Sequence, residues 1–207
     1  MIITIDGYSC LGKSYIGEKV AKHLGIDFFS TGKLVRFVAG TFVSLQSEIS
    51  QEEAAVKKAV EIAEKTEMEE IQNCPWLQEC NTELALRTVE KYLFVDERLQ
   101  KVLKRYVEKR DILLDGRFTF LIFPDAYRKY YFQSSVEMRV ELVSRVRHMS
   151  QEEALIYISY RDSFEKAVKV PESVRVLDPF SAPFGISSDN FLQFLLDDIS
   201  WKESGEI

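Results

Sequence analysis

A glycine-containing stretch near the N-terminus constrains the fold of this chain more than any other feature. Residues 2–5 read IITI, an apolar and β-branched run typical of a short buried strand. Residues 7–14 read GYSCLGKS, which matches the P-loop spacing G-x-x-x-x-G-K-[ST]. Beyond them, Ile16 and Val20 keep an apolar helical face that ends at Gly25. The sequence therefore predicts a strand, a phosphate-binding loop and a helix in succession.

The loop residues suit the binding of a nucleoside triphosphate. Backbone N–H groups of such a loop curl around phosphate oxygens, and the dipole of the following helix favours the anion. Lys13 would reach the β and γ phosphates and the Ser14 hydroxyl would hold Mg²⁺. The predicted cofactor-binding residues are Gly7, Tyr8, Ser9, Cys10, Leu11, Gly12, Lys13, Ser14 and Tyr15. The alternative is a glycine-bearing turn with an incidental lysine, but the strand before it and the helix after it favour the P-loop.

Composition narrows the class of protein. A length of 207 residues suits one α/β domain with a small insertion. The net charge of −6 argues against nucleic acid as the main partner. No run of about 18 apolar residues and no signal peptide is present, so we expect a soluble cytoplasmic protein without membrane contact. A Cys74–Cys80 disulfide is conceivable, although the odd number of cysteines, 3, fits the reducing cytosol better, and their spacing predicts no metal cage.

The rest of the chain alternates between strand and helix patterns, which favours a doubly wound parallel sheet. Further strands are predicted at 26–30, 112–115, 130–132 and 174–177. Helices are predicted from Thr31, over 50–71, over 82–108 with a restart at Asp96, from Ser134, from Ser150 and over 190–201. Three of them begin with a capping box: Ser50 with Glu53, and two more that start at Ser134 and Ser150. Loops are expected at 73–81 and 179–185. Thr31 is predicted as an N-cap, although Arg36 one turn later makes a ligand role possible.

Two other places carry residues that could act on phosphates. Asp115 ends an apolar strand, where a Mg²⁺-associated Walker B aspartate is expected; the alternative is an Asp-Gly turn. The helices that meet at His148 and Met149 both carry arginines, which predicts a hinged lid, whereas the alternative is that these arginines are merely solvated. In the first of the two helices we expect Val136, Val140 and Val143 to face inward, with Arg139, Arg145 and Arg147 around them.

With these motifs placed, the chain resembles the bacterial cytidylate kinases, a family of P-loop nucleoside monophosphate kinases. Residues 3–25 are similar to the family's opening, and STGKLVR at 30–36 resembles its D-T-G-x-x-Y-R segment. ILLDGR and IFPDA, within 112–126, are similar to D-G-R-D-x-x-x-x-x-F-P-D-A. SSVEMR at 134–139 and the Arg161-Asp162 pair resemble the two arms of the family's lid.

The resemblance implies an α/β fold of the P-loop nucleoside triphosphate hydrolase type, with a five-stranded parallel sheet, helices on both faces, a helical lid and a helical acceptor-binding insertion. It implies one kinase domain over 1–207, with a core at 1–40 and 111–207, the insertion at about 41–110 and the lid at about 139–165. The implied activity is phosphoryl transfer from ATP, with Mg²⁺, to CMP or dCMP in a monomeric enzyme. The implied catalytic residues are Lys13, Arg117, Arg139 and Arg161; the substrate-binding residues are Thr31, Arg36, Arg98, Asp115, Arg117 and Asp162; the metal ligands are Ser14 and Asp115.

The chain departs from the family pattern at several positions. Phe118 replaces an aspartate implicated in nucleotide recognition, Glu165 replaces a second aspartate, and Val168 stands in place of an arginine for which Lys169 is a poor substitute. Tyr8, Cys10 and Leu11 are also bulky for a loop that is usually rich in Pro, Gly and Ser. These changes leave two alternatives open: a catalytically impaired, nucleotide-binding paralogue that acts as a partner or regulator, and a P-loop kinase with another small acceptor.

Overall fold

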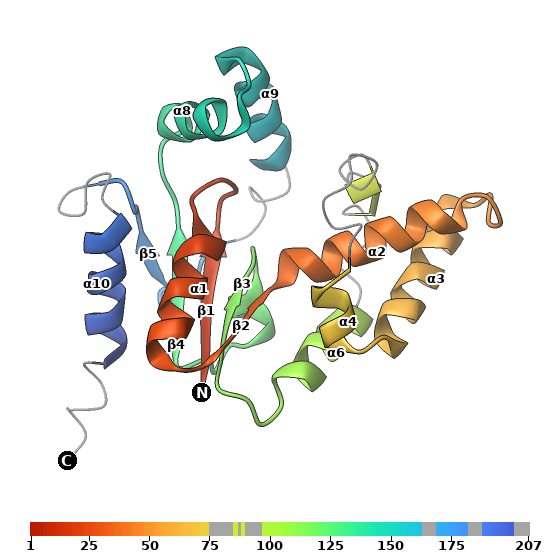
Figure 1. The fold of residues 1–207 in the computed structure, drawn as a ribbon, viewed down its shortest axis with the longest axis horizontal. Coiled ribbons are helices and arrows are strands. Elements are labelled where there is room, and N and C mark those ends of the chain that lie inside the picture. The colour runs from red at the N-terminus through yellow and green to blue at the C-terminus, as the bar shows by residue number, and fades with distance from the viewer. Residues whose placement is uncertain (75–84, 87, 90–96, 163–168, 182–187, 201–207) are drawn as a thin grey trace. The chain divides into compact units, whose positions relative to one another are not determined.

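The computed structural model describes residues 1–74, 85–86, 88–89, 97–162, 169–181 and 188–200 (Figure 1). The chain divides into two compact units, Met1–Phe28 with Asp111–Ile207, and Phe29–Arg110. The boundary at Phe29 lies before the helix that begins at Thr31. Several predicted features lie outside the described residues: Cys80, Asp96, Glu165, Val168, Trp201, and most of the loops at 73–81 and 179–185.

Five strands form one sheet, as the sequence predicts. They are β1 Ile2–Gly7, β2 Asp27–Ser30, β3 Ile112–Asp115, β4 Arg128–Phe132 and β5 Arg175–Leu177. Their order is β2-β3-β1-β4-β5, which places the strand that enters the P-loop in the middle. β1 pairs in parallel with β3 and β4, and β4 pairs in parallel with β5. Because parallel strands are buried on both sides, β1 and β3 are almost continuously apolar.

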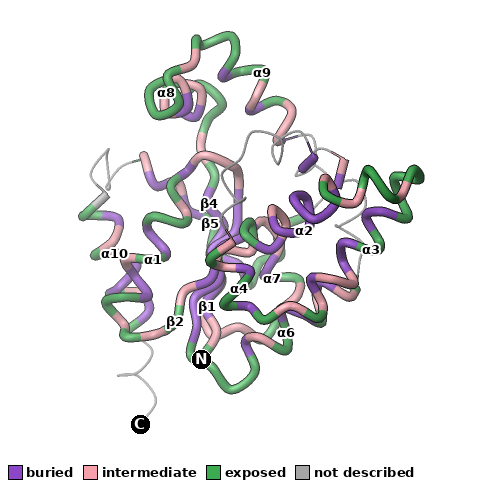
Figure 2. The backbone as a smooth tube through the Cα atoms, turned by 45° about the vertical axis from the view of Figure 1, so that its right-hand side comes forward, coloured by how far each residue is buried: buried purple, intermediate pink, exposed green. Residues whose placement is uncertain are grey.

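The first unit carries α1 Lys13–Leu24 and α10 Ser188–Ser200 on one face of the sheet and α7 Thr119–Ile122 on the other. The helices α8 Val136–Arg147 and α9 Gln151–Asp162 lie beyond one end of the strands (Figure 1). Side chains on a strand alternate between faces, so Tyr130 and Phe132 join the core beneath α1 and α10, whereas Tyr131 packs with Phe120 and Val174 on the other face. The buried colour of Figure 2 follows these strands. In α10, Phe191, Leu195 and Ile199 lie one helical turn apart and are buried in the core beneath α1 and α10.

The second unit is built from helices in its described residues, apart from the end of β2. They are α2 Thr31–Leu45, α3 Glu52–Lys65, α4 Met68–Gln72 and α6 Glu97–Val107, with residues 85, 86, 88 and 89 also helical. α2 packs against α3 and α4, and α3 packs against α6. Small buried residues such as Ala55 and Ala59 allow α3 to approach its neighbours closely. None of the helices in the described part of the chain has the length and apolar character needed to cross a bilayer.

The prediction of one helix over 50–71 is wrong, because the helix is interrupted between α3 and α4. The Thr66 hydroxyl donates to the Ile62 carbonyl at 2.8 Å, and the Thr66 backbone adopts an extended conformation, with φ −86° and ψ 138°. A threonine hydroxyl that binds a nearby carbonyl competes with helix continuation. The predicted capping box at Ser50 is wrong too, since Gln51 is the N-cap and makes no side-chain cap hydrogen bond.

The N-caps of three other helices differ in how well they match the predicted capping residues. Thr31 is not the N-cap of α2: Ser30 is, and its side chain makes no cap hydrogen bond. The cap of α8 is Ser135 instead of Ser134, and the Ser135 hydroxyl accepts from the Met138 N–H at 3.2 Å. The third capping box is confirmed, because Ser150 and Glu153 each receive a hydrogen bond from the other's backbone N–H.

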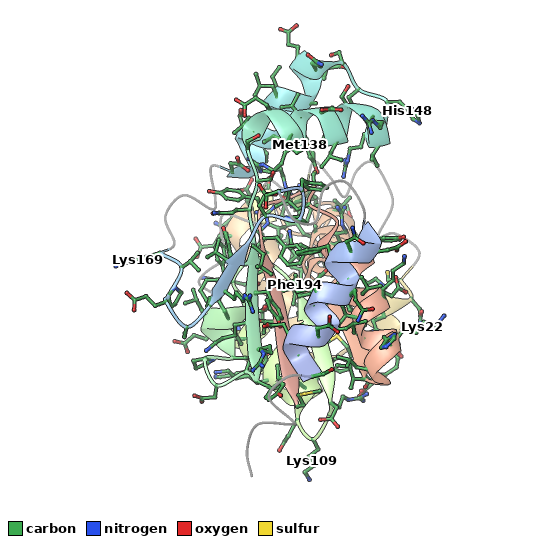
Figure 3. All side chains as sticks on the ribbon, turned by 90° about the vertical axis from the view of Figure 1, so that its left-hand side faces the viewer. Lys22, Lys109, Met138, His148, Lys169 and Phe194 are labelled. Carbon is green, nitrogen blue, oxygen red and sulfur yellow. The ribbon has the colours of Figure 1, made fainter. Side chains whose placement is uncertain are left out.

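Helices α8 and α9 meet at the turn where the sequence predicts, and the hinged lid stays a prediction. They join at His148, which adopts a left-handed conformation with φ 55°, at the turn labelled in Figure 3. Val143, Ala154 and Ile158 form the apolar core between the two helices. The expectation that Val136 faces inward is wrong, since its side chain is 40% exposed.

Candidate active site

The P-loop has a backbone that only particular residues permit. Gly7 has φ 120°, and a Cβ there would lie 2.0 Å from the carbonyl oxygen of Phe132 in β4. The next residue, Tyr8, donates its N–H to the same oxygen at 3.0 Å. The chain then turns through Cys10 and Gly12, both left-handed with φ 66° and 71°. Gly12 is the N-cap of α1 and has no capping side chain, so the first N–H groups of the helix face the loop.

Lys13 lies across this loop. Its ammonium group donates to the carbonyl oxygens of Gly7 at 2.8 Å and Tyr8 at 2.6 Å. These contacts hold a positive charge at the loop, where the phosphates of a nucleotide would be bound.

The side chains of two other loop residues point in different directions. Leu11 is only 2% exposed and belongs to the core beneath α1 and α10, so its bulk is removed from the phosphate site. Tyr15 is 55% exposed, and the Lys19 ammonium lies 4.5 Å from the centre of its ring.

Two predicted catalytic arginines meet at the hydroxyl of Ser9. Arg117, which follows β3, donates from Nη2 at 3.3 Å, and Arg161, near the end of α9, donates from Nε at 3.4 Å. The loop, the end of the sheet and the lid therefore converge on one atom. Two guanidinium groups beside a P-loop lysine create a site that attracts anions, because each can bind phosphate oxygens with forked N–H groups.

The other predicted lid residues, Arg139 and Asp162, bind each other. Arg139 Nη1 donates to Asp162 Oδ1 at 2.8 Å, and its second amino group binds Oδ2. Both side chains are nearly buried, with Arg139 only 2% exposed. The sequence expectation that Arg139 lies around the outside of α8 is wrong, because an ion pair with α9 and the ring of Tyr8 surround it.

Asp115 and Ser14 are the residues that could hold a metal ion. Asp115 ends β3 opposite Ile5, is 3% exposed, and precedes Gly116, whose N–H donates to the Ile5 carbonyl at 3.0 Å. Ser14 lies in the first turn of α1. One carboxylate and one hydroxyl fit Mg²⁺, which prefers oxygen ligands and takes the rest of its shell from water and phosphates. Groups of three or more His, Cys, Asp or Glu side chains suited to a metal are absent from the described residues.

Asp6 is a structural residue of the site that the sequence analysis did not single out. Its carboxylate accepts from the Thr119 N–H at 2.7 Å, the Thr119 hydroxyl at 2.6 Å and the Phe120 N–H at 3.0 Å. Burial raises the pKa of Asp6 to about 6, against the opposing effects of the Thr119 and Phe120 hydrogen bonds and the Lys13 charge. Asp6 thus holds the start of α7 against the end of β1, and its carboxylate oxygens already accept these hydrogen bonds. The signal in the sequence was a polar residue at the end of a buried strand.

Phe118, the residue in place of the family's aspartate, packs into an apolar cluster. Its neighbours are Phe120, Tyr131 and Val174, with Tyr8 at the same cluster. The position next to Arg117 therefore offers an aromatic surface instead of a carboxylate.

The remaining predicted substrate residues belong to the second unit. Thr31 begins α2, and Arg36 follows on the same helix. Arg98 lies on α6, with its Nη1 3.8 Å from Glu61 Oε1 of α3. Of the cysteines, Cys10 and Cys74 are free thiols, and Cys80 lies outside the described residues.

A P-loop at the centre of a five-stranded parallel sheet, with a lysine across the loop and lid arginines beside it, defines a P-loop kinase. Residues 3–172 match the sequence model of the family described as cytidylate kinase. The chain belongs to the cytidylate kinase family and is an ATP-dependent nucleoside monophosphate kinase.

Individual relatives agree with this assignment. The chain is 29% identical to a cytidylate kinase of Thermodesulfovibrio yellowstonii, over 92% of this chain and 88% of the relative. It is 32% identical to a cytidylate kinase of Rhodopirellula baltica, over 78% and 76% of the two chains. Among solved structures, an uncharacterized protein from Eubacterium ventriosum superposes with a TM-score of 0.54 at 13% identity, covering 97% of this chain and 98% of that one, which shows a shared fold.

Proposed function

We propose that this kinase transfers the terminal phosphoryl group of ATP to CMP or dCMP, giving CDP or dCDP. The observation that carries the proposal is the convergence of Arg117 and Arg161 on Ser9, in the loop that Lys13 spans. The cytidylate kinases among its relatives support the choice of acceptor. The presence of all three cations at the loop argues against the alternative of an impaired paralogue.

The residues of the loop would achieve catalysis by positioning and by neutralising charge. Phosphoryl transfer spreads negative charge over the oxygens of the transferred group, so fixed cations and N–H donors lower the barrier without a general base of unusual pKa. Lys13 and the N–H groups at the start of α1 would bind the ATP phosphates, and Arg117 and Arg161 would stabilise the transferred group. Mg²⁺, held by Ser14 and Asp115, would neutralise phosphate charge. Closure of α8 and α9 would exclude water, which otherwise competes as acceptor.

We assign the acceptor's phosphate to Arg117 of the first unit. Thr31, Arg36 and Arg98 belong to the second unit, and their role in acceptor binding is what the family resemblance implies. Phe118 bears on base selectivity: a missing carboxylate at a site that reads a base forfeits about 1–3 kcal/mol of discrimination. We therefore expect CMP and dCMP to be preferred by a smaller margin than an aspartate would give. A net charge of −6 fits a cytoplasmic enzyme that acts on small nucleotides and not on nucleic acid.

A coupled assay with ATP and Mg²⁺ tests the proposal by offering CMP, dCMP, UMP and AMP in turn. We expect the highest kcat/KM with CMP or dCMP. Preference for AMP, or no turnover of any of the four acceptors, would contradict the assignment.

Two lid variants make the test specific to the site. Arg161→Gln should lower kcat by about 100-fold or more, since it removes a donor aimed at developing charge. Arg145→Gln is the matched control, because Arg145 is a lid arginine that is 67% exposed and pairs with Glu141 away from the loop. Equal activity of the two variants would remove Arg161 from the mechanism.

A further inference from the structure

Three consecutive residues of the P-loop contact the lid helices. The Arg139 guanidinium of α8 lies 4.6 Å from the centre of the Tyr8 ring. Ser9 accepts from Arg161 of α9 at 3.4 Å. Cys10 packs against the apolar core between the two helices. Two of the three residues that depart from the family's usual loop composition, Tyr8 and Cys10, therefore contact the lid.

Tyr8 is itself fixed by the sheet. Its ring packs edge-on against Tyr131 of β4, with ring centres 6.0 Å apart and planes at 73°. It also contacts the apolar clusters on both sides of the sheet. A ring held in this way presents one face to Arg139 in a defined place.

Arg139 links that ring to the arginine at the loop. Both of its amino groups bind Asp162, the residue directly after Arg161. Tyr8 therefore contacts Arg139, and Arg139 binds Asp162. Arg161, the neighbour of Asp162 in the chain, contacts the loop again at Ser9. Because Arg139 is 2% exposed, its attraction to the ring is little screened by water.

We propose that Tyr8 is a positioning residue: the face of its ring holds Arg139, and through Asp162 it fixes Arg161 beside the phosphate loop. The proposal deepens the proposed function and rests on it for its catalytic consequence. Its structural content, that Tyr8 fastens α8 and α9 to the loop, can be measured without any acceptor.

Amide hydrogen exchange of the full chain, without nucleotide, tests the structural content. Tyr8→Leu removes the ring but keeps an apolar side chain, and Tyr8→Phe keeps the ring and removes the hydroxyl. We expect Tyr8→Leu to speed exchange in α8 and α9 by about tenfold relative to β1 and β3, which corresponds to about 1.4 kcal/mol. Tyr8→Phe should leave the exchange of α8 and α9 as in the wild type.

Tyr127→Leu is the matched control. Tyr127 also packs against the core of the sheet and also has an arginine over its ring, with Arg128 Cζ 4.8 Å from the centre, but neither residue belongs to the lid. We expect this variant to lower overall stability without selectively speeding exchange in α8 and α9. A selective effect equal to that of Tyr8→Leu would overturn the proposal.

Steady-state kinetics with ATP and the best acceptor test the catalytic consequence. We expect Tyr8→Leu to lower kcat by about tenfold while the KM for ATP stays near the wild-type value, since a group acting in the transition state is displaced. Tyr8→Phe should restore kcat. Unchanged lid exchange in Tyr8→Leu, or loss of lid protection in Tyr8→Phe, would refute the proposal even if the enzyme were active. Absence of any turnover in the wild type would instead refute the proposed function.

Discussion

The buried ion pair between Arg139 and Asp162 gives the sharpest test of how the lid is held together. Replacing Asp162 by Asn preserves the shape of the side chain but removes the carboxylate charge that both amino groups of Arg139, 2% exposed, bind. Breaking one side of a buried ion pair costs about 3–5 kcal/mol, because the remaining charge stays desolvated. We expect Asp162→Asn to lower the free energy of unfolding by this amount.

An exposed ion pair on the same helix supplies the control. Arg145 donates to Glu141 at 2.6 Å, and the two side chains are 67% and 57% exposed. Water and salt screen such a pair, so Glu141→Gln should cost only about 0.3–0.5 kcal/mol. Urea unfolding of both variants measures the difference. A loss of under about 1 kcal/mol in Asp162→Asn would refute the reasoning from burial.

The kinetics of the same variant separate two roles for Asp162. If Asp162 acts only through Arg139, then Asp162→Asn lowers kcat and leaves the KM of both nucleotides near the wild-type values. A direct contact with the acceptor, which the resemblance implied, predicts instead a rise in the acceptor's KM. The measurement therefore decides whether Asp162 binds substrate or positions the lid.

Three more predictions concern the P-loop and the strand that leads to it. Gly7→Ala should destabilise the fold by more than about 4 kcal/mol, because the new Cβ would clash with the backbone of β4. Gly25→Ala, which has open space around the new Cβ, should cost only about 1–2 kcal/mol, and chemical denaturation of both variants measures the difference. The ¹³C signal of the Asp6 carboxyl should titrate near pH 6 in the folded protein, above the pKa of 3.8 in the unfolded chain. Ionisation of Asp6 should therefore reduce the free energy of unfolding by up to about 3 kcal/mol as pH rises from about 4 to about 6, and a titration midpoint below pH 4 would contradict this. Lys13→Ala should weaken ATP binding by about 10- to 100-fold in calorimetry, whereas Lys22→Ala, at the far end of the same helix, should not; equal affinities would contradict the phosphate-loop assignment.

Local patterns predicted the sheet and the loop because both depend on residues close together in the chain. The apolar run before Gly7, the P-loop spacing and the apolar face ending at Gly25 suffice to specify a strand, a loop and a helix. The strand β3 was found for the same reason, since it is a short apolar segment buried on both sides, and β2, β4 and β5 each keep a short apolar or aromatic segment. The kinase family followed from several such segments in a fixed order.

Helix ends were predicted less well, because several side chains compete for the same N–H groups. Ser134 and Ser135 are equally plausible caps, and what separates them is the hydrogen bond from Ser134 to Asp178 of a distant loop, at 3.2 Å. The short helix α7 was missed for a related reason: its first N–H groups bind Asp6, which lies far away in the sequence. When the capping side chain lies on another element, the sequence beside the helix contains no capping motif that could predict where the helix begins.

The position of Arg139 shows the same limit at the site itself. On a helical period, residue 139 shares a face with Val136, Val140 and Val143, but an arginine there still indicates exposure, because burying a lone guanidinium would be prohibitively costly. Burial is tolerated here because Asp162 neutralises the charge and the ring of Tyr8 covers it. Each partner alone looks ordinary, since one ends a helix and the other is a bulky residue in a loop. Tyr8 and Arg139 therefore account for each other: the ring covers the buried guanidinium, so the bulk of this loop residue serves a contact with α8 and is no sign that phosphate binding has been lost.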